Sequence, residues 1–315
     1  MKRYDPLRPL ISFHIPRCAG TSFRETLLRW FGEKLVLHYC QEGKGVLPPV
    51  HPIGPGTCVH GHFQHQRGFG VEDYYPRADQ FIAILRNPLE QAVSHYFYMV
   101  KALNSHKDEF FKIDYDIQKE YFSLENFLKS NCSLMLEYMP FNHRWNNNLK
   151  MTMENHREIL DEYFVYIGIV EDIGTSLKNL AALLGFPESS VVVEKHNAAQ
   201  RFEQPSQEAV DAFMEQNRLE YAIYDYALKT YNNADTLEAC RSEVDLNRYI
   251  AGIESALKVK DNERLSLEKD LMSGIRHMEK ILSIKEGEIA AWEKNVKVKD
   301  AYIEELHRRI KNPFY

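Results

Sequence analysis

The stretch that decides the fold reads His-Ile-Pro-Arg-Cys-Ala-Gly-Thr-Ser-Phe and occupies residues 14–23. A short apolar run at 10–13 comes before it and predicts a buried strand. After it, apolar side chains recur every three or four residues over 24–31, which predicts a helix. The stretch is therefore expected to form the end of a strand, a tight turn and the start of a helix.

This turn has the residues of an anion-binding site. Gly20 lets the backbone pass close to a ligand, and Thr21 or Ser22 is suited to cap the helix. Free N–H groups and the positive end of the helix dipole then face the turn, which suits a phosphate group. Arg17 adds a planar guanidinium that matches phosphate or sulfate oxygens. An ordinary turn between a strand and a helix has similar features, so the stretch alone leaves both interpretations open.

The turn is not the common nucleotide-binding loop, because Thr21 follows Gly20 and no glycine stands five residues before it. It resembles the 5′-phosphosulfate loop of carbohydrate sulfotransferases, which reads His-Ile-Pro-Lys-Thr-Ala-Gly-Thr-Ser/Thr-Phe. These enzymes use 3′-phosphoadenosine 5′-phosphosulfate (PAPS). Arg17 stands in place of the lysine and keeps its charge, although an arginine cannot give up a proton. By this resemblance, the residues that hold the 5′-phosphosulfate are Arg17, Cys18, Ala19, Gly20, Thr21 and Ser22.

A second signature reads Leu-Arg-Asn-Pro-Leu-Glu-Gln-Ala-Val-Ser-His-Tyr and occupies residues 85–96. The apolar run before it predicts a strand, and Pro88 suits the first turn of a helix. Arg86 at the strand end and Ser94 on the helix are placed to share one anion. The signature resembles the 3′-phosphate motif of sulfotransferases, Arg-Asp-Pro with a serine six residues after the proline, with Asn87 in place of the aspartate. The resemblance implies that Arg86 and Ser94 bind the 3′-phosphate of PAPS.

The third signature is His60-Gly61-His62, at the end of a predicted strand over 57–63. Residues two apart on a strand face the same side, so both imidazoles are expected to face one crevice. The segment resembles the His-Gly-His segment of uronyl 2-O-sulfotransferases. That resemblance implies that His62 is the general base and His60 its supporting partner. A histidine pKa near neutrality suits the removal of a proton from a sugar hydroxyl.

Two alternatives for the third signature stay open. One is a zinc site made of His60, His62 and His65, although no cysteine or carboxylate nearby completes a tetrahedral set. The other assigns the role of base to a carboxylate, Glu25 or Glu42. The scheme with a histidine base needs no metal ion.

The resemblance extends over residues 10–231 and includes a closing helix over 217–227. It places Lys195, Asn197 and Arg201 in a loop that covers the cofactor. Lys195 and Arg201 are therefore expected to contact PAPS.

The acceptor is expected to bind against an Asn-rich loop that contains His143, Arg144 and Trp145. Aromatic faces beside amide donors suit a sugar. An ordinary surface loop is the alternative.

Predicted strands alternate with helices, which indicates an α/β fold with a central, mainly parallel sheet flanked by helices. Ligands of such sheets bind outside the carboxyl ends of the strands. All three signatures lie at such ends, so they are expected to converge on one crevice. With the resemblance, this pattern implies a P-loop-like sulfotransferase fold.

The composition changes near Asp235, which predicts a sulfotransferase domain over 1–236 and a helical region over 237–315. In the second region apolar residues recur every seven positions, which predicts a coiled coil and hence self-association. The apolar residues form two sets, and β-branched residues in the first set favour a coiled coil of two helices. A single helix packed on the domain is the alternative. The two sets are Ile275, Leu282, Ile289, Val296, Ile303 and Ile310, and Leu271, Met278, Lys285, Trp292, Lys299 and Leu306.

Charge and cysteine content bound the function further. A net charge of -6 argues against broad nucleic-acid binding. The five cysteines form no CxxC pair, which favours free thiols in a reducing compartment. No stretch has the length of a secretion signal or a membrane span, so a cytoplasmic location is expected.

Together these observations predict a PAPS-dependent sulfotransferase that acts on a hydroxyl of a carbohydrate. His62 accepts the hydroxyl proton, and Arg17 stabilises charge on the bridging oxygen during in-line transfer. A kinase-like nucleotide-binding enzyme and a non-catalytic scaffold that works through its coiled coil are the alternatives.

Overall fold

A computed structural model of the chain describes residues 1–40, 46–104, 123–130, 134–141, 150–191, 193 and 203–311. Contacts within the chain divide it into two compact units, Met1–Leu257 and Lys258–Tyr315. The first unit therefore continues past residue 236, where the change in composition predicts a boundary.

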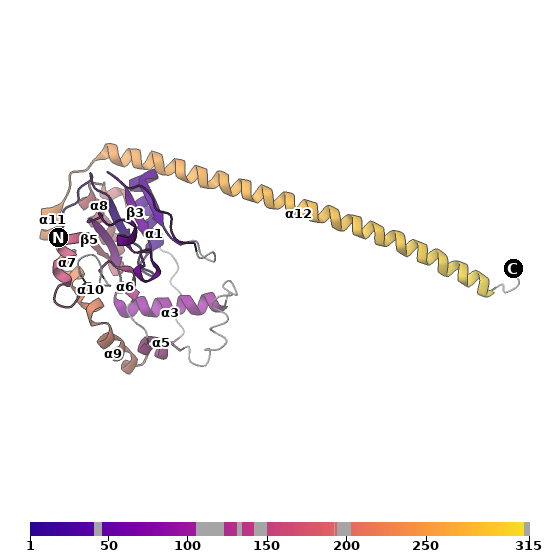
Figure 1. The fold of residues 1–315 in the computed structure, drawn as a ribbon, viewed down its shortest axis with the longest axis horizontal. Helices are drawn as coiled ribbons and strands as arrows, with labels where there is room; N and C mark the ends of the chain where they lie inside the picture. Colours follow the sequence, from indigo (N-terminus) through magenta and orange to yellow (C-terminus); the bar gives the residue numbers. More distant parts are fainter. Residues whose placement is uncertain are drawn as a thin grey trace. The chain divides into compact units, whose positions relative to one another are not determined.

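A five-stranded parallel sheet forms the centre of the first unit (Figure 1). Its strands are β1 Leu10–Phe13, β2 Leu35–His38, β3 Cys58–Gly61, β4 Phe81–Leu85 and β5 Phe164–Ile169. Their order across the sheet is β2-β3-β1-β4-β5. Every residue of β1, β3, β4 and β5 is buried, as expected for a parallel sheet covered on both faces. The sheet confirms the α/β class and the parallel arrangement expected from the sequence.

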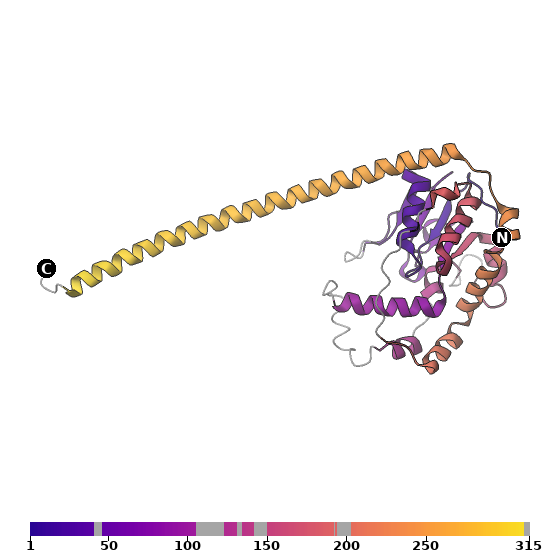
Figure 2. The ribbon, with the colours of Figure 1, turned by 180° about the vertical axis from the view of Figure 1, so that it is seen from behind.

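Helices flank this sheet. The α-helices are α1 Gly20–Phe31, α2 Val71–Tyr74, α3 Pro88–Asn104, α5 Leu124–Ser130, α6 Leu134–Tyr138, α7 His156–Tyr163, α8 Ile173–Leu184, α9 Gln207–Gln216, α10 Arg218–Thr230, α11 Ala234–Cys240 and α12 Leu246–Lys311. Short 3₁₀ turns lie at Gly32–Lys34, His65–Arg67, Val170–Asp172 and Glu188–Ser190. Helix α1 packs on β2 and β3, whereas α7, α8 and α10 pack on β5. A second, smaller apolar cluster joins α3, α5 and α9 (Figure 1, Figure 2).

The strand register brings the three sequence signatures to one edge of the sheet. Phe13, the last residue of β1, pairs with Gly61, the last residue of β3. On its other side Phe13 pairs with Ala83, two residues before β4 ends. The turn after β1, the histidines at the end of β3 and Arg86 after β4 therefore leave the sheet at the same edge, as the sequence predicts.

The start of α12 belongs to the first unit because its first turns pack closely on α1. A Cβ at Gly252 would lie 2.5 Å from the carbonyl oxygen of Trp30. Ser255 Oγ accepts a hydrogen bond of 2.7 Å from the backbone N–H of Glu33. Arg248 donates to the carbonyl of Leu184, and its guanidinium lies 4.3 Å from the centre of the Phe186 ring. These contacts explain why the compact unit ends at Leu257.

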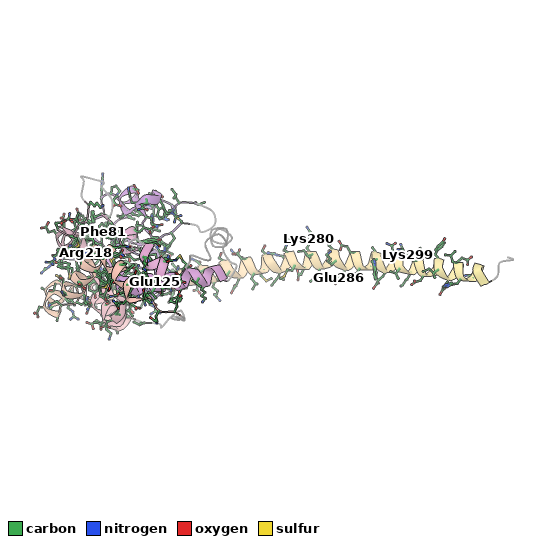
Figure 3. All side chains as sticks on the ribbon, turned by 90° about the horizontal axis from the view of Figure 1, so that it is seen from below. Phe81, Glu125, Arg218, Lys280, Glu286 and Lys299 are labelled. Atoms are coloured by element: carbon green, nitrogen blue, oxygen red, sulfur yellow. The ribbon has the colours of Figure 1, made fainter. Side chains whose placement is uncertain are left out.

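The rest of α12 is a long helix with exposed apolar side chains. The long C-terminal helix agrees with the helical region that the sequence predicts. The exposed apolar members of the two heptad sets are Leu271, Met278, Leu282, Ile289, Trp292, Ile303 and Leu306. Charged side chains such as Lys280, Glu286 and Lys299 project from the same helix (Figure 3). No helix in the described residues is both long enough and apolar enough to cross a membrane.

Candidate active site

The turn between β1 and α1 is made by two non-glycine residues in the left-handed region. Arg17 has a φ of 66° and Ala19 a φ of 56°, a conformation that costs about 1 kcal/mol or more for each such residue. Strain of this kind persists only where the surrounding structure enforces it, and it gathers at functional sites. The tight turn expected from the sequence is therefore present, and it is strained.

Helix α1 begins at Gly20, so the expected cap by Thr21 or Ser22 is wrong. Ala19 holds the cap position, and no side chain accepts a hydrogen bond there. The left-handed turn at Ala19 starts the helix early, which places both hydroxyl residues inside its first turn. No side chain at the cap position therefore accepts the leading backbone N–H groups of α1, and the start of a helix suits an anion.

Gly20 is required by the ring of His14. A Cβ built on Gly20 would lie 1.7 Å from Nε2 of His14, far inside van der Waals contact. The imidazole thus fills the space that any other residue would need. From the sequence, a glycine is expected at position 20 because it lets a ligand approach closely. The structure gives a second reason, which is the position of the His14 ring.

Arg17, Ser94 and Arg86 meet beside this turn. Arg17 Nε donates to Ser94 Oγ at 3.1 Å, and its guanidinium lies 5.0 Å from the centre of the Tyr98 ring. Arg86 reaches the backbone carbonyl of Arg17 at 3.5 Å and also pairs with Glu90 at 3.4 Å. Residues from the two anion-binding signatures, separated in sequence, are thus in direct contact.

Other polar residues hold the two signatures in place, and two of them, Gln91 and Glu171, were not singled out from the sequence. Gln91 Nε2 donates to the carbonyl of Pro16 at 2.8 Å, which ties α3 to the turn. Glu171, after β5, accepts the backbone N–H of Asn87 at 2.9 Å. Asn87 Oδ1 accepts the N–H groups of Leu89 and Glu90 and so caps the start of α3. An asparagine therefore caps the helix at the position where the sulfotransferase motif has an aspartate.

Cys18 is buried within the turn. Burial is the main cause that raises the pKa of its thiol above the usual value. The thiol therefore stays protonated at neutral pH and is a poor nucleophile. The backbone N–H group of Cys18 donates to the carbonyl of Ile15 at 3.2 Å, so it is already paired within the turn.

Three imidazole rings stack at the same edge of the sheet. His14 lies 4.4 Å from His62 and 5.3 Å from His60, measured between ring centres, with interplanar angles of 20° and 12°. Tyr39 and Tyr138 each approach the His62 ring edge-on at 5.1 Å. His14 is thus the ring that contacts both histidines of the third signature. Its position in the turn sequence was evident, but its stacking depends on pairing between β1 and β3.

The hydrogen bond at His62 fixes which of its nitrogens carries the proton. Nδ1 lies 2.8 Å from the backbone carbonyl of His14, and a carbonyl only accepts, so Nδ1 is the donor. In the neutral ring, Nε2 then has the lone pair and is able to accept a proton. Burial lowers the pKa of His62 from its usual value, which keeps the ring neutral at pH 7.

His60 is fully buried beneath these rings. Its Nδ1 pairs with Ser12 Oγ at 2.9 Å, and burial lowers its pKa well below the usual value. His60 therefore lies in the core, and the ring stacked on His62 is that of His14.

Several residues of the two alternatives for the third signature lie in the described part of the chain. Among the residues that the structure describes, no three His, Cys, Asp or Glu side chains are grouped so as to hold a metal ion. His65 lies 3.6 Å from Asp73. Glu25 is paired with Arg24 at 3.7 Å. The remaining sequence candidates lie outside the described residues: Glu42, His143, Arg144, Trp145, Lys195, Asn197 and Arg201.

Comparisons with known proteins find matches among solved structures. No family model matches the chain, and no curated protein matches it. Among solved structures, the chain is similar to mouse sulfotransferase SULT7A1 complexed with PAP, at 16% sequence identity and a TM-score of 0.36. That match covers 76% of this chain and 89% of the mouse chain.

Proposed function

We propose that the chain is a PAPS-dependent sulfotransferase. The observation that carries the proposal is the 3.1 Å contact between Arg17 and Ser94, with Arg86 at the Arg17 carbonyl. This contact joins a strained, uncapped helix start to the end of β4. A donor that has a phosphosulfate at one end and a phosphate at the other suits two such anion-binding elements.

The proposed binding assignment follows the two elements. The 5′-phosphosulfate lies at the turn, held by Arg17 and by backbone N–H groups at the start of α1. The 3′-phosphate is bound by Arg86 and Ser94. Lys195 and Arg201 would complete the cofactor contacts from the covering loop.

The proposed transfer is a single in-line displacement. His62 Nε2 takes the proton of the acceptor hydroxyl while the hydroxyl oxygen forms a bond to sulfur. The bond between sulfur and the bridging phosphate oxygen breaks, and adenosine 3′,5′-bisphosphate leaves. Arg17 and the N–H groups of the turn stabilise the charge that grows on that bridging oxygen. The neutral His62, with its lone pair on Nε2, is in the form that the step requires.

We propose a carbohydrate hydroxyl as the acceptor. Support comes from the resemblance of the His-Gly-His segment and from the rings of Tyr39 and Tyr138 beside His62. Aromatic edges and faces with polar tips suit sugars. A screen with labelled PAPS against glycans, phenols and tyrosine peptides tests this assignment. Label on a phenol or a peptide, with none on a glycan, would overturn it.

Binding of adenosine 3′,5′-bisphosphate tests the activity class directly. By titration calorimetry we expect the bisphosphate to bind more tightly than ATP. Arg86→Ala and Ser94→Ala should each weaken binding about 10-fold or more, because each removes a phosphate contact. Arg218→Ala is the matched control, since Arg218 pairs with Glu215 on the surface. Preference for ATP would favour a kinase-like enzyme, and absence of binding to either nucleotide would favour a scaffold.

We also propose that two copies associate through α12 beyond Leu257. The support is the row of exposed apolar side chains at heptad spacing, including Leu282, Ile289 and Trp292, which are 60%, 57% and 68% exposed. A single helix cannot bury such a row, whereas a second copy can. Light scattering on the full chain should give the mass of a dimer or small oligomer, and a monomer would exclude the coiled coil.

A cytoplasmic location stays a prediction, and the described cysteines are all free thiols.

A further inference from the structure

His14 connects three separate parts of the site. Its backbone carbonyl accepts the proton of His62 Nδ1 at 2.8 Å. Its ring Nδ1 shares a hydrogen bond of 2.8 Å with the hydroxyl of Tyr39, just after β2. Its Nε2 occupies the space above Gly20, at the start of α1. One residue of the turn thus contacts the base, the edge of the sheet and the start of the anion-binding helix.

The bond between His14 and Tyr39 is a neutral one. Burial is the main cause that lowers the pKa of His14 to about 3, with His62 and Arg24 contributing in the same direction. Burial also raises the pKa of Tyr39 above its usual value. Neither group is charged at pH 7, so the pair fixes geometry and adds no charge to the site. A buried polar atom that loses such a partner is left unsatisfied, so the pair holds the His14 ring in place.

We propose that His14 and Tyr39 are positioning residues that set the orientation and the tautomer of His62. The inference rests on the proposed function, because it assigns His62 the role of base. The Tyr39 hydroxyl holds the His14 ring, the ring sits against Gly20, and the backbone of His14 holds the Nδ1–H of His62. The anion-binding turn and the base are therefore oriented by one residue.

Activity measurements form the first arm of the test. Tyr39→Phe removes only the hydroxyl and keeps the ring that packs on His62. We expect kcat to fall about 10- to 100-fold, the range found when the partner that orients a histidine is lost. The KM for PAPS should change less than about twofold, because no donor contact is removed. Tyr226→Phe is the matched control, since that hydroxyl makes a 2.7 Å bond to Asp161 on α7.

A second pair of variants separates a loss of positioning from a loss of folding. His14→Asn keeps a polar group near the position of Nδ1, and His14→Ala removes it. We expect His14→Asn to retain more of kcat than His14→Ala, at similar affinity for adenosine 3′,5′-bisphosphate. Equal kcat in the two variants would overturn the role of the Tyr39 bond.

Nitrogen-15 NMR of the histidines provides an arm that needs no activity. In the unmodified protein His62 should be the neutral tautomer with its proton on Nδ1, and in Tyr39→Phe the population with the proton on Nε2 should rise. A proton on Nε2 in the unmodified protein, or an unchanged tautomer together with unchanged kcat in Tyr39→Phe, would overturn the inference. Failure of the proposed function would instead appear as a lack of bisphosphate binding with the tautomer as expected.

Discussion

Gly20 illustrates how a single side chain fixes the identity of its neighbour. Gly20→Ala would place a Cβ 1.7 Å from His14 Nε2, so the imidazole would have to leave its position. We expect loss of about 1–3 kcal/mol of stability, as for other overpacked sites. Transfer should fall at the same time, because His14 contacts His62. Thermal unfolding and turnover measure the two effects.

Gly274→Ala is the control for that change. Gly274 lies on α12 with nothing within 4 Å of a Cβ built there, and alanine is the better helix former by about 1 kcal/mol. The control should keep turnover and raise or preserve stability. Unchanged turnover in Gly20→Ala would show that the His14 ring is not needed where it lies.

His62 is expected to set the pH dependence of the transfer. His62→Ala should lower kcat about 100-fold or more with little change in bisphosphate affinity, because a base acts on the acceptor. Burial lowers the pKa of His62 below its usual value of 6.5, and a base works only when neutral. kcat/KM should therefore be flat above about pH 6.5 and decline only at lower pH. A decline that begins above pH 7 would point to another base.

The sequence predicted that Arg17, Ser94 and Arg86 lie close together, because charged and hydroxyl residues at strand ends and helix starts are visible as residue types. The structure places the three in contact, and their role in binding stays a prediction. The stacking of His14 on His62 was not predicted, because it depends on pairing between β1 and β3. Gly61 has a similar hidden cause: a Cβ there would lie 1.9 Å from the carbonyl oxygen of His38, on the neighbouring strand.

At the level of elements, the start of α12 is part of the first compact unit, Met1–Leu257. A chain that ends at residue 257 keeps the contacts of Gly252 and Arg248 with α1 and α8, whereas a chain that ends at 236 loses them. The shorter chain should be less stable by roughly 3–5 kcal/mol, since the rings of Trp30 and Phe186 lose cover. Its Tm should accordingly be about 10 °C lower.

The chain that ends at 257 should bind adenosine 3′,5′-bisphosphate as the full chain does and run as a monomer in light scattering. Calorimetry, thermal unfolding and light scattering on the two shortened chains measure these outcomes. Equal Tm values for the two would mean that the first turns of α12 do not stabilise α1.

The elements were predictable where the pattern of apolar residues is local. The runs that became β1, β4 and β5 are short, apolar and bounded by polar residues, and the heptad of α12 is visible over many turns. The composition change near Asp235 was a poorer guide, because docking of α12 depends on two glycines, Gly32 and Gly252, that allow close backbone approach. Such a contact has no signal in either segment alone.

The whole molecule should be sensitive to acid because buried histidines are numerous. Burial lowers the pKa of His14 to about 3 and those of His38 and His95 to about 4, and it also lowers the pKa values of His60 and His62. Below pH 6.5 the unfolded chain binds protons that the folded chain does not, so stability falls as pH falls. At about 1.4 kcal/mol per pKa unit, Tm should be roughly 10 °C lower at pH 4.5 than at pH 7.5.

Glu72 changes the stability with pH in the direction opposite to that of the buried histidines, and the histidines are more numerous. Burial raises its pKa to about 8, so the folded chain holds a proton that the unfolded chain releases, and stability falls as pH rises from 4.5 to 8. Glu72→Gln should therefore gain stability relative to the unmodified protein as pH rises through that range. His38→Gln should reduce the fall in Tm between pH 7.5 and pH 4.5. His277→Gln, at an exposed position on α12, is the control. If Tm falls equally with decreasing pH in the unmodified protein, in His38→Gln and in His277→Gln, the assignment to buried histidines is contradicted.

The strand order has a consequence for how the chain folds during synthesis. β1 is made first but pairs only with β3 and β4, and β4 in turn waits for β5, about 80 residues later in the chain. At roughly 5–20 residues per second, the strand that carries the anion-binding turn stays unpaired on the ribosome for several seconds. Until β3 and β4 emerge, its three apolar residues have no neighbouring strand to pair with. A chaperone that binds short apolar segments would therefore meet the nascent chain first at residues 10–13, directly before the turn that is proposed to bind the donor.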